Sequence, residues 1–145
     1  MASELQAVDR AVTSVLTADA DVSEAVGNRI YAGAAPQGAV QPYVVFQRVG
    51  GADRPAVGGG ETVCSRTVYA VEVVGAAGGF AELDPAAGAV DACLSTLEES
   101  VSLGSETYRV RGAGRVDPVR RVETVEGRRY FHVGGRYRIF AQRVG

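Results

Sequence analysis

The sequence predicts an α+β fold: a mainly antiparallel sheet of about five or six strands with two helices packed on one face. Two stretches place apolar residues at the three- and four-residue steps of an amphipathic helix. The segments between and after them are rich in Val, Tyr and Thr and largely alternate apolar with polar residues, which is typical of strands. Because the strands follow one another in groups, the predicted order α-β-β-β-α-β-β-β favours hairpins over repeated parallel β-α-β units.

The first predicted helix covers residues 4–16. Ser3 and Gln6 form a capping box, in which a hydroxyl and an amide three residues apart bind free backbone N–H groups. The apolar stripe of this helix consists of Leu5, Val8, Val12, Val15 and Leu16. Asp21 is expected to cap one further turn that closes at Gly27, since glycine suits the left-handed backbone at a helix end.

Three strands are expected before the second helix: a short one at Ile30 and Tyr31, then residues 43–49 and residues 64–74. The segment between the second and third of these strands, residues 50–63, contains five glycines and is too long for a tight hairpin. They are therefore expected to form a flexible Gly-rich loop, and loops of this length are often functional.

The second predicted helix has Asp84 as its N-cap and Pro85 at its first position, where the missing N–H costs nothing. Glu98 and Glu99 are expected to lie in solvent at its end. Its apolar stripe consists of Ala87, Val90, Leu94, Leu97 and Val101.

Three strands end the chain, at residues 107–111, 119–125 and 129–143. Glu126 and Gly127 form the turn between the last two strands. The adjacent glycines at positions 134 and 135 interrupt the final strand and predict a bulge or close packing against a neighbouring strand.

A chain of 145 residues fits a single domain, 1–145, that buries about 70% of the surface exposed by its unfolded chain. No staple is therefore required, and Cys64 and Cys93 are expected to be two buried thiols rather than a disulfide. No apolar run is long enough to span a membrane, and the N-terminus is acidic and polar rather than signal-like. The composition indicates a soluble, intracellular protein.

Charge is divided unevenly along the chain. All fifteen basic residues are arginine, a usage that fits a GC-rich coding sequence. Ten arginines and four acidic residues follow position 103, whereas five arginines and thirteen acidic residues precede it. The basic half suits a nucleic acid or an acidic protein surface, although exposed Arg-rich strand faces are the simpler interpretation. The candidate protein–protein interface consists of Asp53, Arg54, Glu61, Arg120, Arg121, Arg136 and Arg138.

No pattern in the sequence indicates an enzyme, a cofactor or a metal site. His132 is the only histidine, and its place between Phe131 and Val133 in a strand predicts a surface or interface residue. One histidine and two separated cysteines do not supply the ligands of a common metal site or a Cys–His nucleophile. The glycines at 58–60 lack the lysine of a phosphate-binding loop, and those at 75–79 lack the spacing of a dinucleotide loop.

Residues 26–46 carry a more specific pattern: a helix end, a short strand, a Gly/Pro turn and an apolar strand. Its members are Gly27, Ile30, Tyr31, Pro36, Gln37, Gly38, Pro42, Tyr43, Val44 and Val45. The arrangement resembles the small tail-completion or tail-terminator proteins of long-tailed bacteriophages. The resemblance covers nearly the whole chain, up to a Tyr-His strand near its end, although Phe131 separates Tyr130 from His132 here.

This resemblance implies a structural virion protein, made in the bacterial cytoplasm, that caps the head-proximal end of the tail tube. It implies a ring, usually of six copies, that stops tube growth and supports head-to-tail joining. The expected partners are further copies of the chain, the tail tube protein and a head-side connector or neck protein. DNA is expected to pass through the ring lumen without specific binding, and no cofactor or membrane contact is implied.

Two other interpretations fit the sequence. A head-side connector or neck subunit shares this size and composition, and the tail length of particles that lack the protein distinguishes the two roles. A nucleic-acid-binding module using the Arg-rich C-terminal strands would bind duplexes in a steeply salt-dependent way. A small hydrolase or ligand-binding domain has no residue constellation to support it.

Overall fold

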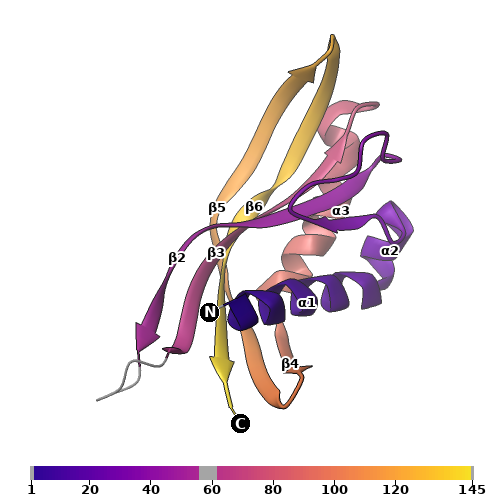
Figure 1. The fold of residues 1–145 in the computed structure, drawn as a ribbon. Helices are drawn as coiled ribbons and strands as arrows, with labels where there is room; N and C mark the ends of the chain where they lie inside the picture. The colour runs from indigo at the N-terminus through magenta and orange to yellow at the C-terminus, as the bar shows by residue number, and fades with distance from the viewer. Residues whose placement is uncertain (1, 56–61, 145) are drawn as a thin grey trace.

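The computed structural model describes residues 2–55 and 62–144 (Figure 1). Its helices are α1 (Ala2–Ala18), α2 (Ala20–Val26) and α3 (Gly79–Ser95). Its strands are β1 (Ile30–Ala32), β2 (Tyr43–Pro55), β3 (Thr62–Gly75), β4 (Glu98–Leu103), β5 (Glu106–Val125) and β6 (Arg128–Arg143). Within these residues the strands form one sheet in the order β1-β2-β3-β6-β5-β4, parallel between β1 and β2 and antiparallel elsewhere. The predicted α+β class with a mainly antiparallel sheet is confirmed.

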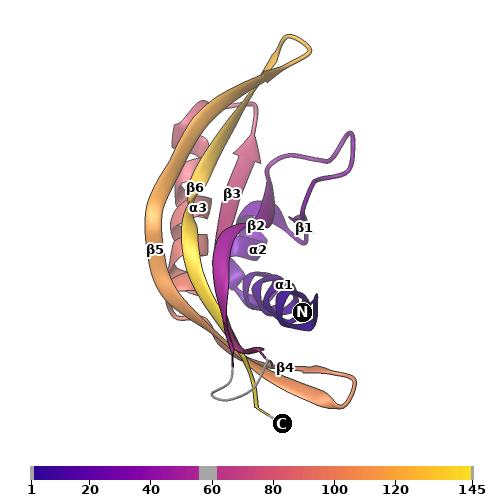
Figure 2. The same ribbon diagram turned by 60° about the vertical axis from the view of Figure 1, so that its left-hand side comes forward.

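The helices pack on one face of the sheet. Every second residue of the central strands is buried beneath them, because side chains alternate between the faces of a strand. These residues include Val44, Phe46, Thr67, Tyr69, Val71, Val73, Val133, Tyr137, Ile139 and Ala141. The helices add Val8, Val12 and Leu16 of α1, Val22 and Val26 of α2, and Leu83, Val90 and Leu94 of α3. Figure 2 shows how strongly β5 and β6 are bowed, so the sheet curls around this core.

Two buried tyrosines hold the helices to the sheet. Tyr69 and Tyr137 are cross-strand neighbours of β3 and β6, and each is 1% exposed. The Tyr69 hydroxyl donates to Asp9 of α1 at 2.9 Å, and the Tyr137 hydroxyl donates to Asp91 of α3 at 2.8 Å. Burial and the adjacent carboxylate raise the pKa of both phenols, so both remain donors at neutral pH. These hydrogen bonds therefore fix α1 and α3 over the middle of the sheet.

The prediction for the helix start at Asp84 is wrong. Helix α3 begins at Gly79, so Pro85 lies inside it and cannot donate a backbone hydrogen bond. The earlier start buries Leu83, which is 2% exposed, and places Phe80 edge-on against a β6 phenyl ring at a centroid distance of 5.0 Å. These apolar contacts offset the missing hydrogen bond.

The predicted cap of the preceding turn is also wrong. Asp19, not Asp21, caps α2, because its carboxylate accepts a hydrogen bond from the Val22 N–H at 3.0 Å. The turn itself is a separate helix, and it ends at Gly27 as predicted. The described residues therefore hold three helices rather than two.

The end of the second predicted helix is a strand. α3 ends at Ser95, and Glu98 and Glu99 belong to β4, which pairs with β5. A spacing of four residues satisfies a helix stripe and a strand face alike, so Leu97 and Val101 are buried in either conformation. The next two predicted strands are parts of the single strand β5, whose register with β6 shifts between residues 112 and 117.

The predicted loop at residues 50–63 is much shorter in the structure. Residues 50–55 extend β2 and residues 62–63 begin β3, while residues 56–61 lie outside the described part of the chain. Gly51 permits this pairing, because a Cβ atom there would lie 2.1 Å from the Arg66 carbonyl oxygen. The glycines at this point therefore serve close strand packing rather than a loop.

Gly134 confirms the predicted close packing in the last strand. A Cβ atom at this position would lie 2.0 Å from the Val71 carbonyl oxygen of β3. The two cysteines are free: Cys93 is buried in α3, whereas Cys64 is half-buried in β3. Among the helices of the described residues, none has the length and apolar character that crossing a membrane requires.

Candidate assembly interface

The sheet face that points away from the helices, here called the open face, is the most charged surface of the fold. No helix of the described residues packs on it, and its side chains alternate with the buried ones along β3, β5 and β6. Its arginines in these three strands are all exposed: Arg66, Arg109, Arg111, Arg121, Arg128, Arg136 and Arg138. A partner that approaches this face therefore meets guanidinium groups first.

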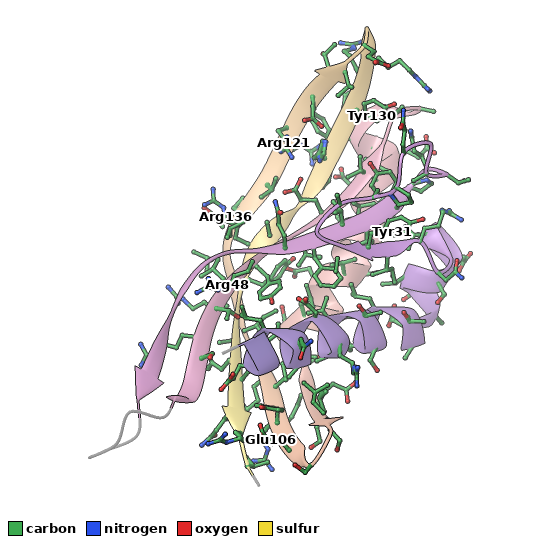
Figure 3. The ribbon with its side chains drawn as sticks, in the orientation of Figure 1. Tyr31, Arg48, Glu106, Arg121, Tyr130 and Arg136 are labelled. Carbon is green, nitrogen blue, oxygen red and sulfur yellow. The ribbon has the colours of Figure 1, made fainter. Side chains whose placement is uncertain are left out.

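Three of the seven predicted interface residues lie on the open face. Arg121 and Arg136 follow the β5–β6 pair, as Figure 3 shows, and Arg138 is the next open-face residue of β6. The Arg136 Nε atom lies 3.2 Å from an Asp117 carboxylate oxygen, so this pair spans β6 and β5. Because both groups are about half exposed, the pair contributes little to stability and remains available to a partner.

Arg120 lies on the opposite, helix-covered face. Its guanidinium donates to Asp84 of α3 at 2.8 Å and stacks over the Phe80 ring at 4.4 Å. Adjacent residues of a strand point to opposite faces, so the predicted Arg120–Arg121 pair is divided between the two sides of the sheet. Arg120 therefore connects β5 to α3.

Two of the remaining predicted residues lie beside β3 in the backbone register. Asp53 and Arg54 lie near the end of β2, opposite Ser65 and Cys64 in the β2–β3 register. Glu61 lies outside the described residues.

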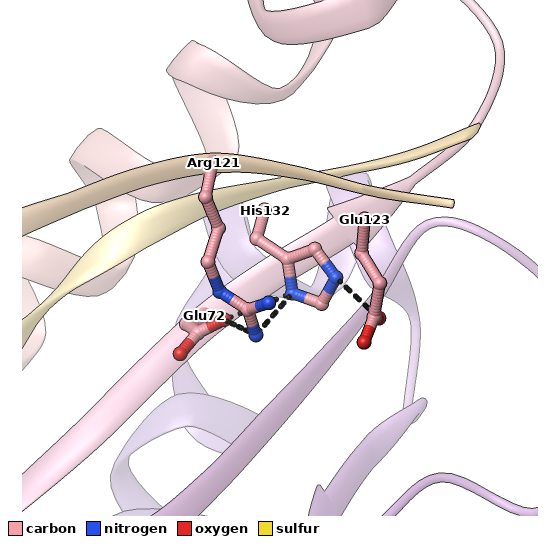
Figure 4. A network of polar contacts seen from close by, with 4 residues as sticks. All are labelled: Glu72, Arg121, Glu123 and His132. Atoms are coloured by element: carbon pink, nitrogen blue, oxygen red, sulfur yellow. Dashed lines mark hydrogen bonds and ion pairs between the residues drawn. The ribbon is translucent and has the colours of Figure 1, made fainter. Parts of the chain in front are cut away.

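A polar cluster occupies the open face where β3 ends beside the β5–β6 pair (Figure 4). His132 Nδ1 lies 2.9 Å from Oε1 of Glu72, and its Nε2 lies 3.2 Å from Oε1 of Glu123. Arg121 donates to the same Glu72 oxygen at 3.1 Å. Both ring nitrogens of His132 therefore lie within hydrogen-bond distance of a carboxylate, and Nδ1 also lies 3.3 Å from the Arg121 guanidinium.

His132 was predicted to be a surface or interface residue, and its burial in this cluster contradicts the first of these alternatives. Its side chain is 8% exposed and lies between carboxylates of β3 and β5. The hydrogen bond from His132 lowers the pKa of Glu72, with help from Arg121 and against the effect of burial. Glu72 and Glu123 were not identified from the sequence, because only the strand register brings them to the histidine.

The β5–β6 pair ends in a projecting arm, residues 119–133, visible at the top of Figure 1, and β3 borders only the base of this arm. β3 ends opposite Phe131, so the arm beyond it has no strand on either side. Val122 and Val125 of the arm are each 46% exposed. A groove of about 490 Å³ separates the arm from residues 35–41, the Gly/Pro turn singled out in the sequence. The arm and this groove form a second surface that a partner can contact.

Charged side chains, rather than catalytic groups, characterise these surfaces. In residues 2–55 and 62–144, no three His, Cys, Asp or Glu side chains are arranged to hold a metal ion. The cluster around His132 also has no hydroxyl or thiol nucleophile among its hydrogen-bonded members.

Comparison with known proteins identifies the family. A family model described as tail completion protein gp17 matches residues 10–134. The chain belongs to this family. The resemblance read from residues 26–46 is thereby confirmed, and the family match gives the protein a structural, tail-completion role in a virion.

Solved structures share the fold across their full lengths. A chain in the virion of a native gene transfer agent particle is 25% identical, with a TM-score of 0.61, over 94% of this chain and 97% of that one. A second solved structure is 17% identical, with a TM-score of 0.52, over 94% of this chain and 92% of that one. At this identity the likeness shows a shared fold alone. No curated protein matches the sequence.

Proposed function

We propose that the protein caps the head-proximal end of the tail tube as a ring of identical copies, ends tube polymerisation and supports joining of the head. Membership of the tail completion family over residues 10–134 carries this proposal. The similar chain in a gene transfer agent virion supports it, because that chain has nearly the same length and belongs to an assembled particle.

The surfaces of the chain suit such a role. A ring of identical subunits needs two different, complementary patches on each copy, and a cap needs a further surface for the tube. The open face, the arm at residues 119–133 and the acidic helices α2 and α3 are chemically distinct surfaces of one subunit. The ring, most simply of six copies, would contact the tube protein on one side and a head-side neck protein on the other.

A polymerisation assay tests tube capping directly. Purified tube protein is allowed to assemble with increasing amounts of this protein, and tube lengths are measured by negative-stain electron microscopy. A capping protein stops elongation, so mean tube length should fall as its proportion rises. Tubes whose length is independent of the added protein would show that it does not terminate the tube and would favour a neck subunit.

A further inference from the structure

We propose that Arg66, Arg109, Arg111 and Arg138, here called the arginine patch, form a weak, sequence-independent contact for the phosphate backbone of duplex DNA. The patch occupies the half of the open face that is farther from the arm. It was not recognised in the sequence, apart from Arg138, because its members come from three strands that are distant in the chain.

The strand register places the four side chains together. Arg66 of β3, Phe140 of β6 and Arg111 of β5 form one row across the sheet. Arg138 precedes Phe140 by two residues in β6, and Arg109 precedes Arg111 by two residues in β5, so both point to the same face. Since neighbouring strands are about 4.8 Å apart, the row spans only about 10 Å between its two arginines.

The arginines of the patch differ from their neighbours in having no carboxylate partner among the described residues. Arg121 and Arg136, on the other half of the open face, lie within 3.2 Å of Glu72 and Asp117. No such ion pair is formed by the four patch arginines in residues 2–55 and 62–144. One carboxylate lies beside the patch, because Glu98 of β4 is opposite Arg111 of β5 in the strand register. Four guanidinium groups against this single carboxylate leave the patch net positive, which an anionic partner would stabilise.

The composition of the patch favours phosphate over a protein partner. A stable protein interface has an apolar core, yet the exposed large apolar side chains are elsewhere. They are Val40, Val49, Val116, Val122, Val125 and Val144, and none belongs to the rows that carry the patch. Phe140, at the centre of the patch, is only partly exposed. Guanidinium groups on a flat, polar surface suit phosphate oxygens, which accept bidentate hydrogen bonds and carry no sequence information.

The remaining charges limit the strength of the contact. The chain as a whole has a net charge of −2, and Glu72, Asp117 and Glu123 balance the arginines nearer the arm. A duplex is therefore attracted to one half of the open face and repelled from most of the molecule. The contact belongs to a single copy, so it does not depend on ring formation.

Fluorescence anisotropy with a short labelled duplex tests the patch. Two duplexes of unrelated sequence should bind equally, and affinity should fall steeply as salt is raised, since each phosphate contact contributes about −0.9 to the log–log slope. The double variant Arg66→Gln/Arg138→Gln should bind at least tenfold more weakly and reduce the magnitude of that slope by about 1.8. Its thermal unfolding should match that of the unaltered protein, because both side chains are exposed.

A matched control removes the same charge from the arm, with Arg128→Gln/Arg129→Gln, and should retain most of the affinity. Equal losses of DNA affinity in the two double variants would overturn the proposal that the arginine patch binds DNA, because affinity would then depend on net charge alone. So would the absence of binding at low salt. Salt-sensitive self-association that the Arg66→Gln/Arg138→Gln variant abolishes, without DNA affinity, would assign the patch to another copy of the chain instead.

Discussion

Glu72 is the residue on which the polar cluster of the open face depends. One of its oxygens accepts hydrogen bonds from His132 and from Arg121, and thus connects β3 to both strands of the arm at its base. The side chains of Glu72 and His132 are only 13% and 8% exposed, so these bonds are shielded from water. Charge-assisted hydrogen bonds in such a setting are stronger than surface ion pairs.

Replacing this carboxylate should change how stability depends on pH. The pKa of Glu72 is lower in the folded protein than in the unfolded chain, so its contribution is complete above the ordinary glutamate pKa of about 4.3 and disappears as pH falls below it. The variant Glu72→Gln should lose about 1.5–3 kcal/mol of unfolding free energy at pH 7 and less at acid pH. Urea unfolding at several pH values measures both quantities.

The control for this prediction is Glu24→Gln, which removes the same charge from the exposed surface of α2. It should leave the unfolding free energy nearly unchanged. If Glu72→Gln instead lost the same stability at every pH, the carboxylate would not act through its charge.

For individual residues, the sequence showed which strand a side chain belongs to but not which residues of other strands it contacts. The alternation of Phe131, His132 and Val133 correctly indicates a strand, but it cannot show that Glu72, sixty residues earlier, is aligned with the histidine. Arg120 and Arg121 likewise appear as one basic pair in the sequence, although the strand sends them to opposite faces. Register, which depends on pairing between distant segments, is the missing information.

The long strands of the sheet depend on close backbone approach at individual glycines. Gly134 lies where β6 passes β3, and a Cβ atom there would enter the space of the Val71 carbonyl oxygen. The three nearest atoms are all backbone atoms of β3, so no flexible side chain can move aside. The glycine is therefore a structural requirement of the β3–β6 pair, from whose ends both the arm and the β2–β3 hairpin extend.

The variant Gly134→Ala should be destabilised by about 2 kcal/mol or more, because a methyl group must push the two strands apart. Thermal or urea unfolding measures the loss. The matched control is Gly88→Ala in α3, where an added Cβ atom meets nothing within 4 Å and should raise helix stability by about 0.5–1 kcal/mol. A Gly134→Ala variant as stable as the unaltered protein would contradict the close packing.

Periodicity predicted the elements well and their ends poorly. The first helix and all three strands of the first half were predicted, because their apolar patterns are long and regular. Leu97 and Val101 fit the stripe of α3 and the buried face of β4 equally, so that helix was extended too far. The glycines at 50 and 51 were interpreted as loop residues, since only the structure shows the Arg66 carbonyl group that approaches Gly51.

On the scale of the whole molecule, the helices occupy one side of the sheet and the arginine-rich open face is the other side. This division follows from the alternation of side chains along each strand, which is visible in the sequence and made the fold class predictable. The composition of the open face was not predictable, because it depends on the register between distant strands. The family pattern at residues 26–46 forms β1, the turn beside the arm and the start of β2. That segment thus identifies the family and also borders a candidate contact surface.

The chain can contact several partners at once because its charged and projecting surfaces are separate. The arginine patch and the arm lie at opposite ends of the β5–β6 pair, and α2 and α3 cover the far side of the sheet. A subunit placed between a tube, a head and its own neighbours needs this separation, since each contact must form without blocking the others.

The most direct test of tube capping is the length of tails in particles that lack this protein. The gene is deleted from the parent particle, and tails are measured by negative-stain electron microscopy, with a plasmid copy of the gene as the control for rescue. Overlong tubes of variable length without heads, restored to uniform length by the plasmid, are the predicted result. Tails of normal length beside unattached heads would contradict tube capping and place the protein in the neck.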